Sequence, residues 1–238
     1  MITKSQIQFI KNLKFKKYRI KHQLFIVEGR KNIKELLASE YEYINIYATR
    51  SWINHNQEIN AIQISNNELE NISNQKNPNE VLAIVKINNH KIFSNTGVVL
   101  VLDEINDPGN MGTILRICDW FGISDIVCSK NTVDIYNPKV VQASTGSIFR
   151  INVCYANLSD YLKNIDTPIY GAFLDGENIK NISFPKNFHL VMGNEANGIS
   201  KEITQLISER ISIPHVSKKT DSLNVAIATS ILLYEISK

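Results

Sequence analysis

Three short segments in the C-terminal half of the chain carry the side chains best suited to chemistry. They are Asn110–Arg116, Gly193–Gly198, and Ile213–Pro214 together with Ser222–Asn224. Each places glycine or a small polar residue where a predicted strand ends and a helix begins, and open α/β sheets bind ligands at such junctions. Because three of them follow in order, each with a polar side chain suited to a nucleotide-like ligand, the sequence predicts a single composite site.

The first segment opens a predicted amphipathic helix. Arg116 follows Ile114 by two residues, roughly 200° around a helix, so its guanidinium is displaced toward the loop or solvent. Asn110 can cap this helix, and Gly112 allows a backbone or a ligand to approach closely. An ordinary surface arginine is the alternative interpretation of Arg116. The residues expected to face the core follow helical spacing: Ile114, Ile117, Cys118 and Phe121.

The other two segments offer a carboxylate, a hydroxyl and an amide. Glycines at Gly193 and Gly198 let a ligand pass close to the main chain, and Glu195 could fix a ribose hydroxyl or a facing arginine. Ser222 is expected to cap the last helix, while Asn224 in its first turn presents an amide to the loop. The alternatives are a common glycine-rich loop before a helix, plain capping, and a solvated asparagine.

Three acids, Asp103, Glu104 and Asp107, lie in the loop before the first of these helices. They could hold a divalent ion, but no partner acids are evident elsewhere, so a turn with side-chain hydrogen bonds is favoured and no metal is expected. The cysteines are odd in number and form no CxxC pair, which indicates neither a disulfide framework nor a thiolate zinc site and fits a reducing cytoplasm. They are Cys118, Cys128 and Cys154.

The elements that must position these residues form two predicted domains, 1–90 and 97–238, joined by the polar, Asn-rich linker 86–96. The second domain has strands alternating with helices, so we expect a mostly parallel sheet covered on both faces. The strands expected in the first domain are Leu24–Val27, Tyr43–Tyr47, Ala61–Ile64 and Val81–Val85, with helices near 30–39, 49–55 and 66–72. Those expected in the second are Val98–Leu102, Asp125–Cys128, Ile151–Cys154, Ile169–Phe173, His189–Met192 and Ile211–Ile213.

Charge is distributed unevenly along the 238 residues, although the total is only +3. The first 31 residues hold nine Lys or Arg and one Glu, a net +8, whereas the remainder holds 17 basic and 22 acidic residues, a net −5. Such clustering indicates a surface for a polyanion such as RNA, with a solvated helix face as the alternative. The longest apolar run, Val98–Leu102, is far too short to cross a bilayer, so no membrane association is expected.

Together the three segments resemble the SpoU/TrmH family of RNA ribose 2′-O-methyltransferases of the SPOUT superfamily. The motifs match as Asn110-x-Gly112-x-x-x-Arg116, as Gly193-x-Glu195-x-x-Gly198, and as Ile213-Pro214 with Ser222-Leu223-Asn224. The resemblance covers about residues 97–238. Phe25–Gly29, followed by a helix, is similar to the small substrate-binding domain, like ribosomal protein L30, that many members carry at the N-terminus.

The resemblance implies a deep trefoil knot, S-adenosyl-L-methionine as cofactor, and a homodimer whose active site gathers residues at the interface. It places Gly193, Ile213, Leu223 and Gly198 around the cofactor. It implies an RNA substrate, with ribosomal RNA favoured over transfer RNA because a basic appended domain can grip folded RNA. A methyltransferase acting on a transfer RNA ribose or on a base, and a non-catalytic RNA-binding protein that keeps the fold, are the alternatives.

The resemblance also implies roles for five residues, Arg116, Asn110, Glu195, Ser222 and Asn224. Arg116 is interpreted first as a clamp for the RNA phosphate, because a guanidinium rarely gives up its proton, and second as the base that families of this kind often assign to it. Glu195 and Asn110 would orient it, while Ser222 and Asn224 would shape the loop and hold the nucleotide. The chain departs from the family pattern at 215–221, where a histidine follows Pro214 and no glycine occurs.

Overall fold

The computed structural model describes residues 2–88, 96–217, 219 and 221–238. Within them the chain forms two compact units. The first comprises the described part of Met1–Asn89 together with Asp134–Phe149, and the second comprises the described parts of His90–Val133 and Arg150–Lys238. This grouping differs from the predicted domains in one segment, 134–149, which packs with the first unit.

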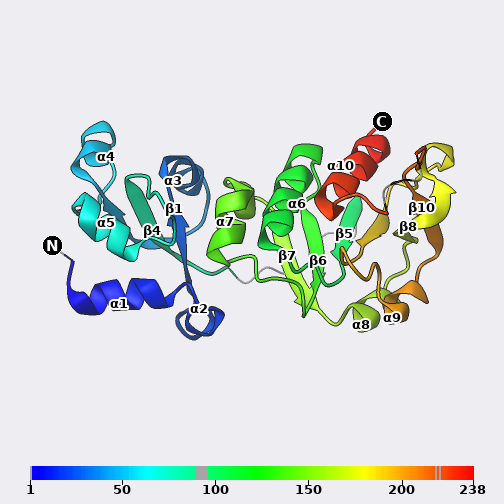
Figure 1. The fold of residues 1–238 in the computed structure, drawn as a ribbon, viewed down its shortest axis with the longest axis horizontal. Coiled ribbons are helices and arrows are strands. Elements are labelled where there is room, and N and C mark those ends of the chain that lie inside the picture. The colour runs from blue at the N-terminus through cyan, green and yellow to red at the C-terminus, as the bar shows by residue number, and fades with distance from the viewer. Residues whose placement is uncertain (1, 89–95, 218, 220) are drawn as a thin grey trace. The chain divides into compact units, whose positions relative to one another are not determined.

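The first unit is built on a four-stranded sheet in the order β1-β4-β2-β3. Strands β1 and β2 are both antiparallel to β4, and the short β3 runs parallel to β2. Its strands are β1 (Leu24–Glu28), β2 (Tyr43–Ala48), β3 (Ile62–Gln63) and β4 (Val81–Lys86). Its helices before the linker are α1 (Lys4–Asn12), α2 (Lys16–His22), α3 (Arg30–Leu37), α4 (Arg50–His55) and α5 (Asn66–Ile72) (Figure 1).

Local sequence explains where several of these helices begin. Thr3 and Ser65 are N-caps of α1 and α5, and each forms a reciprocal capping box with the residue three positions later, Gln6 and Glu68. Both helices pack on one face of the sheet around a shared apolar cluster. The cluster includes Ile10, Leu13, Ile26, Leu69, Ile72 and Ile84. The helices α1 and α2 were not predicted, because their lysines obscure the apolar period.

The segment 134–149 contributes α7 (Pro138–Ser144) and the 3-10 turn η1 (Ser147–Phe149) to the first unit. Helix α7 packs beside β1. The buried Arg19 fixes the start of the segment, because its Nε and Nη2 donate to Asp134 Oδ2 at 3.0 and 2.5 Å. Tyr136 packs on Phe25 of β1 with ring centroids 4.6 Å apart. Ionic and apolar contacts therefore hold this segment against the N-terminal part of the chain.

The second unit is a six-stranded sheet in the order β10-β8-β9-β5-β6-β7, and all five strand pairings are parallel. This confirms the predicted parallel α/β sheet. Its strands are β5 (Val98–Leu102), β6 (Asp125–Ser129), β7 (Asn152–Ala156), β8 (Ile169–Asn178), β9 (Phe188–Met192) and β10 (Glu209–Ser212). Its helices are α6 (Pro108–Phe121), α8 (Leu158–Lys163), the 3-10 turn η2 (Ile179–Asn181), α9 (Lys201–Thr204) and α10 (Val225–Ile236).

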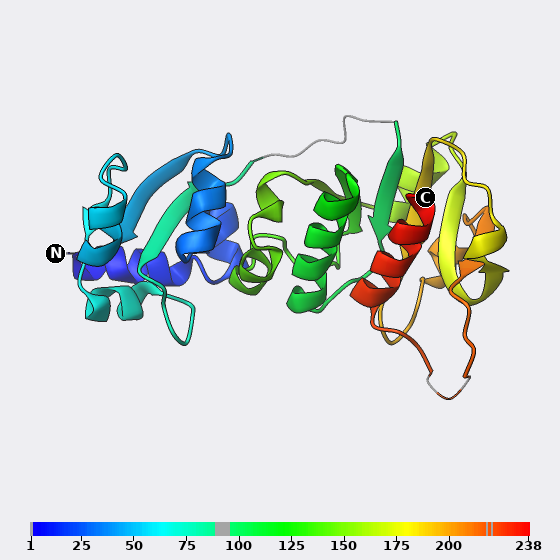
Figure 2. The same cartoon turned by 90° about the horizontal axis from the view of Figure 1, so that it is seen from above.

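Helices cover both faces of this sheet, with α6 and α10 on one side and α8 and α9 on the other (Figures 1 and 2). Alternation along β5 sends Val99 and Val101 to the second side, where they join a core cluster with residues of α8 and α9. The helices α6 and α10 pack against each other although 103 residues of the chain separate the end of α6, Phe121, from the start of α10, Val225. Two distant parts of the sequence are thus brought side by side.

The buried face of α6 differs from the predicted one. Met111, Gly112, Ile114, Leu115 and Cys118 are buried, whereas the expected Ile117 and Phe121 are only half-buried. The buried residues of α6 lie closer to its start than expected because α6 packs against α10 as well as the sheet. The periodicity of α6 alone does not predict that contact. Among the described helices, none has the length and apolar content needed to span a bilayer. The trefoil knot stays a prediction.

Candidate functional site

The site forms at the carboxyl ends of the two central strands of the second unit. Strands β5 and β9 are neighbours, with Leu102 opposite Met192, so the loops that leave them lie side by side. The backbone N–H of Asp103 continues the ladder by donating to the Met192 carbonyl at 2.9 Å. Because parallel sheets bind ligands at this edge, the two loops hold the positions from which side chains meet a ligand.

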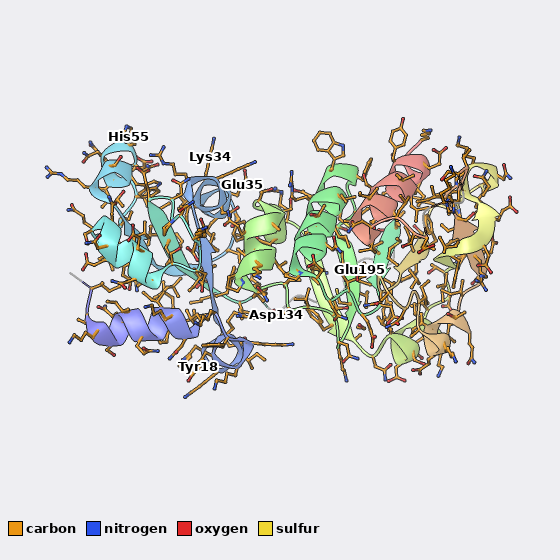
Figure 3. All side chains as sticks on the ribbon, in the orientation of Figure 1. Tyr18, Lys34, Glu35, His55, Asp134 and Glu195 are labelled. Carbon is orange, nitrogen blue, oxygen red and sulfur yellow. The ribbon has the colours of Figure 1, made fainter. Side chains whose placement is uncertain are left out.

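A chain of three side chains joins the three predicted segments. Asn110 Nδ2 donates to Glu195 Oε1 at 2.6 Å, and Asn224 Nδ2 donates to Asn110 Oδ1 at 2.9 Å. Each residue comes from a different loop or helix start, and Glu195 lies beside α6 (Figure 3), at the first turn that carries Asn110. The sequence prediction of one composite site is thus matched by direct contact between its parts.

The direction of this chain is fixed by the start of α10. Asn224 is the N-cap of the helix, and its Oδ1 accepts from the backbone N–H groups of Ala226 and Ile227 at 3.0 and 3.3 Å. Its amide nitrogen must therefore face outward to Asn110 Oδ1, which leaves the Asn110 nitrogen for the carboxylate of Glu195. The helix start thus sets the orientation of both amides, and one carboxylate oxygen, Oε2, is left for a ligand among the described residues.

Two predicted caps are wrong. Helix α6 begins at Pro108, and Asp107 caps it by accepting from the Asn110 backbone N–H at 2.7 Å, so Asn110 lies in the first turn with its side chain free for the network. Helix α10 is capped by Asn224 instead of Ser222. The hydroxyl of Ser222 is exposed and has no hydrogen bond within the described part of the chain.

The glycines of the second segment allow the loop 193–198 to adopt its backbone conformation. A Cβ on Gly193 would lie 2.3 Å from the carbonyl carbon of Gly198 and from the nitrogen of Ile199, so no side chain fits there. Gly198 has open space around it but a left-handed backbone, φ +67°. Asn194 and Gly198 exchange two backbone hydrogen bonds at 3.0 and 2.9 Å, which closes the loop that carries Glu195.

Two residues that the sequence analysis did not assign to the site tie its loops together. Asp103 Oδ2 accepts from the Ser200 backbone N–H at 2.8 Å, and Asn194 Nδ2 donates to the Glu104 carbonyl at 2.8 Å. The acids of the first loop therefore serve in turns and caps, as the favoured alternative predicted. No group of three or more potential metal-ligating residues occurs in the described ranges. Asp103 directly follows β5 and Asn194 lies inside the segment Gly193–Gly198, and these positions are a signal that could have found them.

Arg116 does not join this network. Its side chain is exposed on α6, about 9 Å along the axis and about 120° around the helix from Asn110. No hydrogen bond or ion pair involves its guanidinium within the described residues. The predicted displacement from the core is confirmed, and the guanidinium shares an exposed face of α6 with Trp120, four residues later and 84% exposed.

The third segment runs from the sheet edge to the start of α10. Ile213 is half-buried just after β10, and Leu223, immediately before Asn224, is 48% exposed. The described residues between them are exposed. Of the four residues expected around the cofactor, Gly193 and Gly198 therefore lie in the loop that carries Glu195, and Leu223 adjoins the third member of the network.

An apolar stripe borders the site. Three exposed residues of α10 follow helical spacing on its outer face, and Leu223 and Trp120 add to them. Helices α6 and α10 are in contact, so these side chains belong to neighbouring surfaces. The α10 residues are Ile227, Ile231 and Tyr234. Exposed apolar residues gathered on one face are typical of interaction surfaces.

A parallel sheet with polar side chains gathered at its carboxyl edge defines a doubly wound ligand-binding α/β protein. The chain belongs to the SpoU rRNA Methylase family, whose model matches residues 97–234, and it is therefore a methyltransferase. Residues 4–83 match the MRM3-like substrate binding domain. The second match falls within the first unit of the structure.

Similar proteins match over almost the whole chain. The 23S rRNA (guanosine(2553)-2′-O)-methyltransferase RlmP of Bacillus subtilis is 29% identical over 95% of this chain and 93% of its own. A Porphyromonas gingivalis structure assigned to the TrmH family of RNA methyltransferases has a TM-score of 0.90 at 35% identity, covering 99% and 98%. An AdoMet-bound rRNA methyltransferase from Sinorhizobium meliloti has a TM-score of 0.85 at 26% identity, covering 99% and 95%.

Proposed function

We propose that the chain transfers a methyl group from S-adenosylmethionine to the 2′-hydroxyl of a ribose in ribosomal RNA. Its membership of the SpoU rRNA methylase family supports the reaction class and the cofactor. The structural observation that carries the proposal is the hydrogen-bonded chain from Glu195 through Asn110 to Asn224, which unites three loops at the ligand-binding edge. Ribosomal RNA is favoured because the B. subtilis relative modifies it and similarity extends through the N-terminal unit.

The residues present fit the cofactor. Its adenosine part is uncharged and needs hydrogen-bond donors and acceptors, and its amino acid part carries an ammonium and a carboxylate. The site offers two neutral amides, one carboxylate and the backbone groups of two loops. We assign its binding to the loop of Gly193 and Gly198 and to Ile213 and Leu223. When bound, the cofactor supplies an electrophilic methyl group on a positively charged sulfur.

The protein must align the ribose oxygen with that methyl group and accept one proton. Orientation supplies much of the rate in such a displacement. We assign Arg116 to bind the RNA phosphate next to the target ribose through paired N–H donors, which places the 2′-oxygen. Asn110 holds the Glu195 carboxylate in place, and Glu195 in turn orients the guanidinium or accepts a ribose hydroxyl. Ser222 and Asn224 shape the loop against the nucleotide.

The active enzyme is proposed to be a homodimer. Arg116 lies outside the network of its own chain, on the same face of α6 as the exposed Trp120 and close to the apolar stripe of α10. Pairing two copies through these surfaces would bury the stripe and carry each guanidinium to the edge of a partner's site. The reducing cytoplasm is the proposed location, in keeping with three free cysteines.

The decisive experiment compares Arg116→Ala with the wild type. We expect methyl transfer from labelled S-adenosylmethionine to ribosomal RNA to fall by at least about a thousandfold, because the aligned phosphate contact is lost. Calorimetry should show almost unchanged cofactor affinity, which would exclude misfolding as the cause. Retained turnover would contradict the assigned role of Arg116.

A wild-type chain that binds no S-adenosylmethionine would favour the alternative, a non-catalytic RNA-binding protein on this fold. If the chain does bind the cofactor, mass mapping of ribosomal and transfer RNA from a deletion strain would identify the substrate. A missing methyl group on a transfer RNA ribose would replace the ribosomal proposal with the other alternative.

A further inference from the structure

The first unit contains a pocket of about 540 Å³ that the methyl-transfer site does not use. The turn between α1 and α2, the end of β1, the loop after α5 and helix α7 surround it. Its size falls within the range of about 300–1,000 Å³ that is usual for small-ligand sites. The polar and aromatic residues of its wall are Lys14, Phe15, Glu28, Asn74, Gln75, Asn137, Lys139 and Gln142.

We infer that this pocket receives one unpaired nucleotide of the RNA substrate, with its base against Phe15 and its phosphates beside Lys14 and Lys139. The identity of the ligand as RNA rests on the proposed function. Recognition of folded RNA commonly works through single bases that leave the helix and stack on aromatic side chains.

Phe15 provides a stacking surface at the pocket. Its side chain is 48% exposed, although burying an apolar ring of this size is normally favourable. The ammonium of Lys14 lies 4.8 Å from the ring centroid, so a cation accompanies the aromatic face. Tyr18 lies one helical turn further, on α2 (Figure 3). The ammonium of Lys17 lies 5.0 Å from the centroid of the Tyr18 ring. Alternating rings and cations are the combination that binds single-stranded nucleic acid.

The opposite wall carries amides that can recognise the edge of a base. Gln142 Oε1 accepts from Gln75 Nε2 at 2.8 Å and from Asn32 Nδ2 at 3.2 Å. The Gln142 amide nitrogen and the Gln75 amide oxygen therefore face away from these bonds, and neither has a partner among the described residues. One donor group and one acceptor group on adjacent side chains can complement the hydrogen-bonding edge of a base.

A buried acceptor next to this wall is also unpartnered. Asn32 is only 4% exposed, and its Nδ2 donates to the Glu28 carbonyl and to Gln142, but its Oδ1 has no hydrogen bond. A buried oxygen without a donor costs free energy. The side of the pocket formed by Gln75 and Gln142 is therefore backed by a polar atom whose hydrogen bonding is incomplete.

The charge of the pocket suits an anion. Its one acid, Glu28, is buried at the end of β1, and its carboxylate accepts from Ser73 Oγ and from the backbone and side chain of Asn74. The lysines Lys14 and Lys139 are exposed on two sides. Lys16 and Lys17 extend the exposed basic surface along α2.

Arg19 positions the mouth of the pocket without adding a free charge. It is 2% exposed and paired with Asp134, and its Nη1 donates to the carbonyls of Leu13 and Lys14 at 3.0 and 2.7 Å. The buried guanidinium thus fixes the backbone that presents Lys14 and Phe15, and it ties that backbone to the segment that leads into α7.

The test uses the full-length chain and an RNA hairpin whose stem contains a single-nucleotide 2-aminopurine bulge. A fully paired hairpin of the same length, with 2-aminopurine inside the stem, is the control probe. We expect the bulged hairpin to bind more tightly and its 2-aminopurine fluorescence to fall further on binding, because the base moves onto Phe15. Equal affinity and equal fluorescence change for the two hairpins would overturn the inference.

Phe15→Leu keeps an apolar side chain of similar bulk and removes the ring. It should weaken binding of the bulged hairpin about fivefold to a hundredfold, the usual contribution of one stacked base, and should reduce the fluorescence change. Tyr43→Leu is the matched control, since Tyr43 is an aromatic residue 39% exposed on β2 outside the pocket wall. If both variants bind like the wild type, or if an acidic peptide displaces the hairpin from the pocket, the inference is wrong.

Two further variants test recognition of the base edge and contact with the RNA phosphates. Gln142→Ala should reduce the preference for the bulged hairpin without changing affinity for the paired one. Lys14→Gln combined with Lys139→Gln should lower the magnitude of the slope of log K against log salt concentration by about 1.4. Each phosphate contact with a single strand contributes about 0.7 to that magnitude. An unchanged salt dependence would remove both lysines from the proposed contact.

Cofactor binding distinguishes failure of this inference from failure of the proposed function. Phe15→Leu should bind S-adenosylmethionine like the wild type and lose methyl transfer only at limiting RNA concentration. A wild type that methylates RNA but shows no effect of Phe15→Leu would overturn the pocket alone. A wild type that binds no S-adenosylmethionine would overturn the proposed function, whatever the hairpins show.

Discussion

A buried histidine in the second unit should make the stability of the protein depend on pH. His189 on β9 is 4% exposed, and its two ring nitrogens contact the hydroxyls of Tyr161 at 2.7 Å and Thr167 at 2.8 Å. Burial lowers the pKa of His189 from its ordinary 6.5 to about 4. Burial also raises the pKa of Tyr161 to about 12, so the tyrosine keeps its proton throughout the acidic range.

The sign of the effect follows from which state binds the proton. Between pH 6.5 and about 4 the unfolded chain protonates this imidazole while the folded chain does not, so stability falls as pH falls and the loss is complete below about pH 4. The difference between 6.5 and about 4 corresponds to about 3.4 kcal/mol at most. Between pH 7.5 and 4.5 we expect about 2.5 kcal/mol of the free energy of unfolding to be lost through this group.

Urea unfolding followed by circular dichroism at several pH values would measure this loss. His189→Gln removes the titrating group, so the stability difference between wild type and variant should shrink by about 2.5 kcal/mol from pH 7.5 to 4.5. Taking the difference cancels the other titrating groups. His215→Gln, at an exposed histidine of the same unit, is the control for the loss of a histidine as such. Parallel pH curves for wild type and His189→Gln would refute the reasoning.

Three further predictions concern the site and its surroundings. Gly193→Ala should cost about 1–3 kcal/mol and weaken S-adenosylmethionine binding at least tenfold in calorimetry, because its Cβ would meet backbone at 2.3 Å. Gly198→Ala, which has space but a left-handed backbone, should cost only about 1 kcal/mol, and equal effects would contradict this explanation. Asn110→Asp places a second carboxylate 2.6 Å from the glutamate of the network and should reduce turnover at neutral pH more than Asn110→Ala; the reverse order would refute the assigned hydrogen bond. Ile231→Glu on the apolar stripe should shift the protein to a monomer in sedimentation and abolish methyl transfer, whereas an active monomer would exclude the proposed dimer.

The sequence was sufficient to predict the parallel sheet, because its central strands are short, continuous apolar runs. Val98–Leu102 was predicted with the bounds that the structure shows. The far end of β8 was missed, since Asp175–Asn178 are polar and half-exposed to exposed residues that are held in the strand by pairing with β10. Pairing of that kind depends on a partner 34 residues away and leaves no local pattern.

The site was predictable to the level of its motifs and not to the level of its contacts. Pro108 in the first turn was a signal that Asp107 caps α6, and it frees Asn110 for the network. The contact between Asn110 and Asn224 could not be predicted, because it depends on α10 returning to pack beside α6. The resemblance supplied Arg116 as a functional residue, whereas its spacing indicated only that it leaves the core.

Because the segment Asp134–Phe149 belongs to the first unit, the N-terminal residues alone are not a complete structural unit of this protein. The segment leaves the second unit after β6, packs with the first unit, and returns to begin β7, so the polypeptide crosses from one unit to the other three times. Deleting residues 1–90 would expose Ile135, Tyr136 and Val140 to solvent, although they are buried in the intact chain. A chimera that exchanges RNA specificity therefore has to transplant the segment Asp134–Phe149 along with the N-terminal residues, and after one protease nick in the linker the N-terminal fragment would stay attached only through its non-covalent packing on that segment.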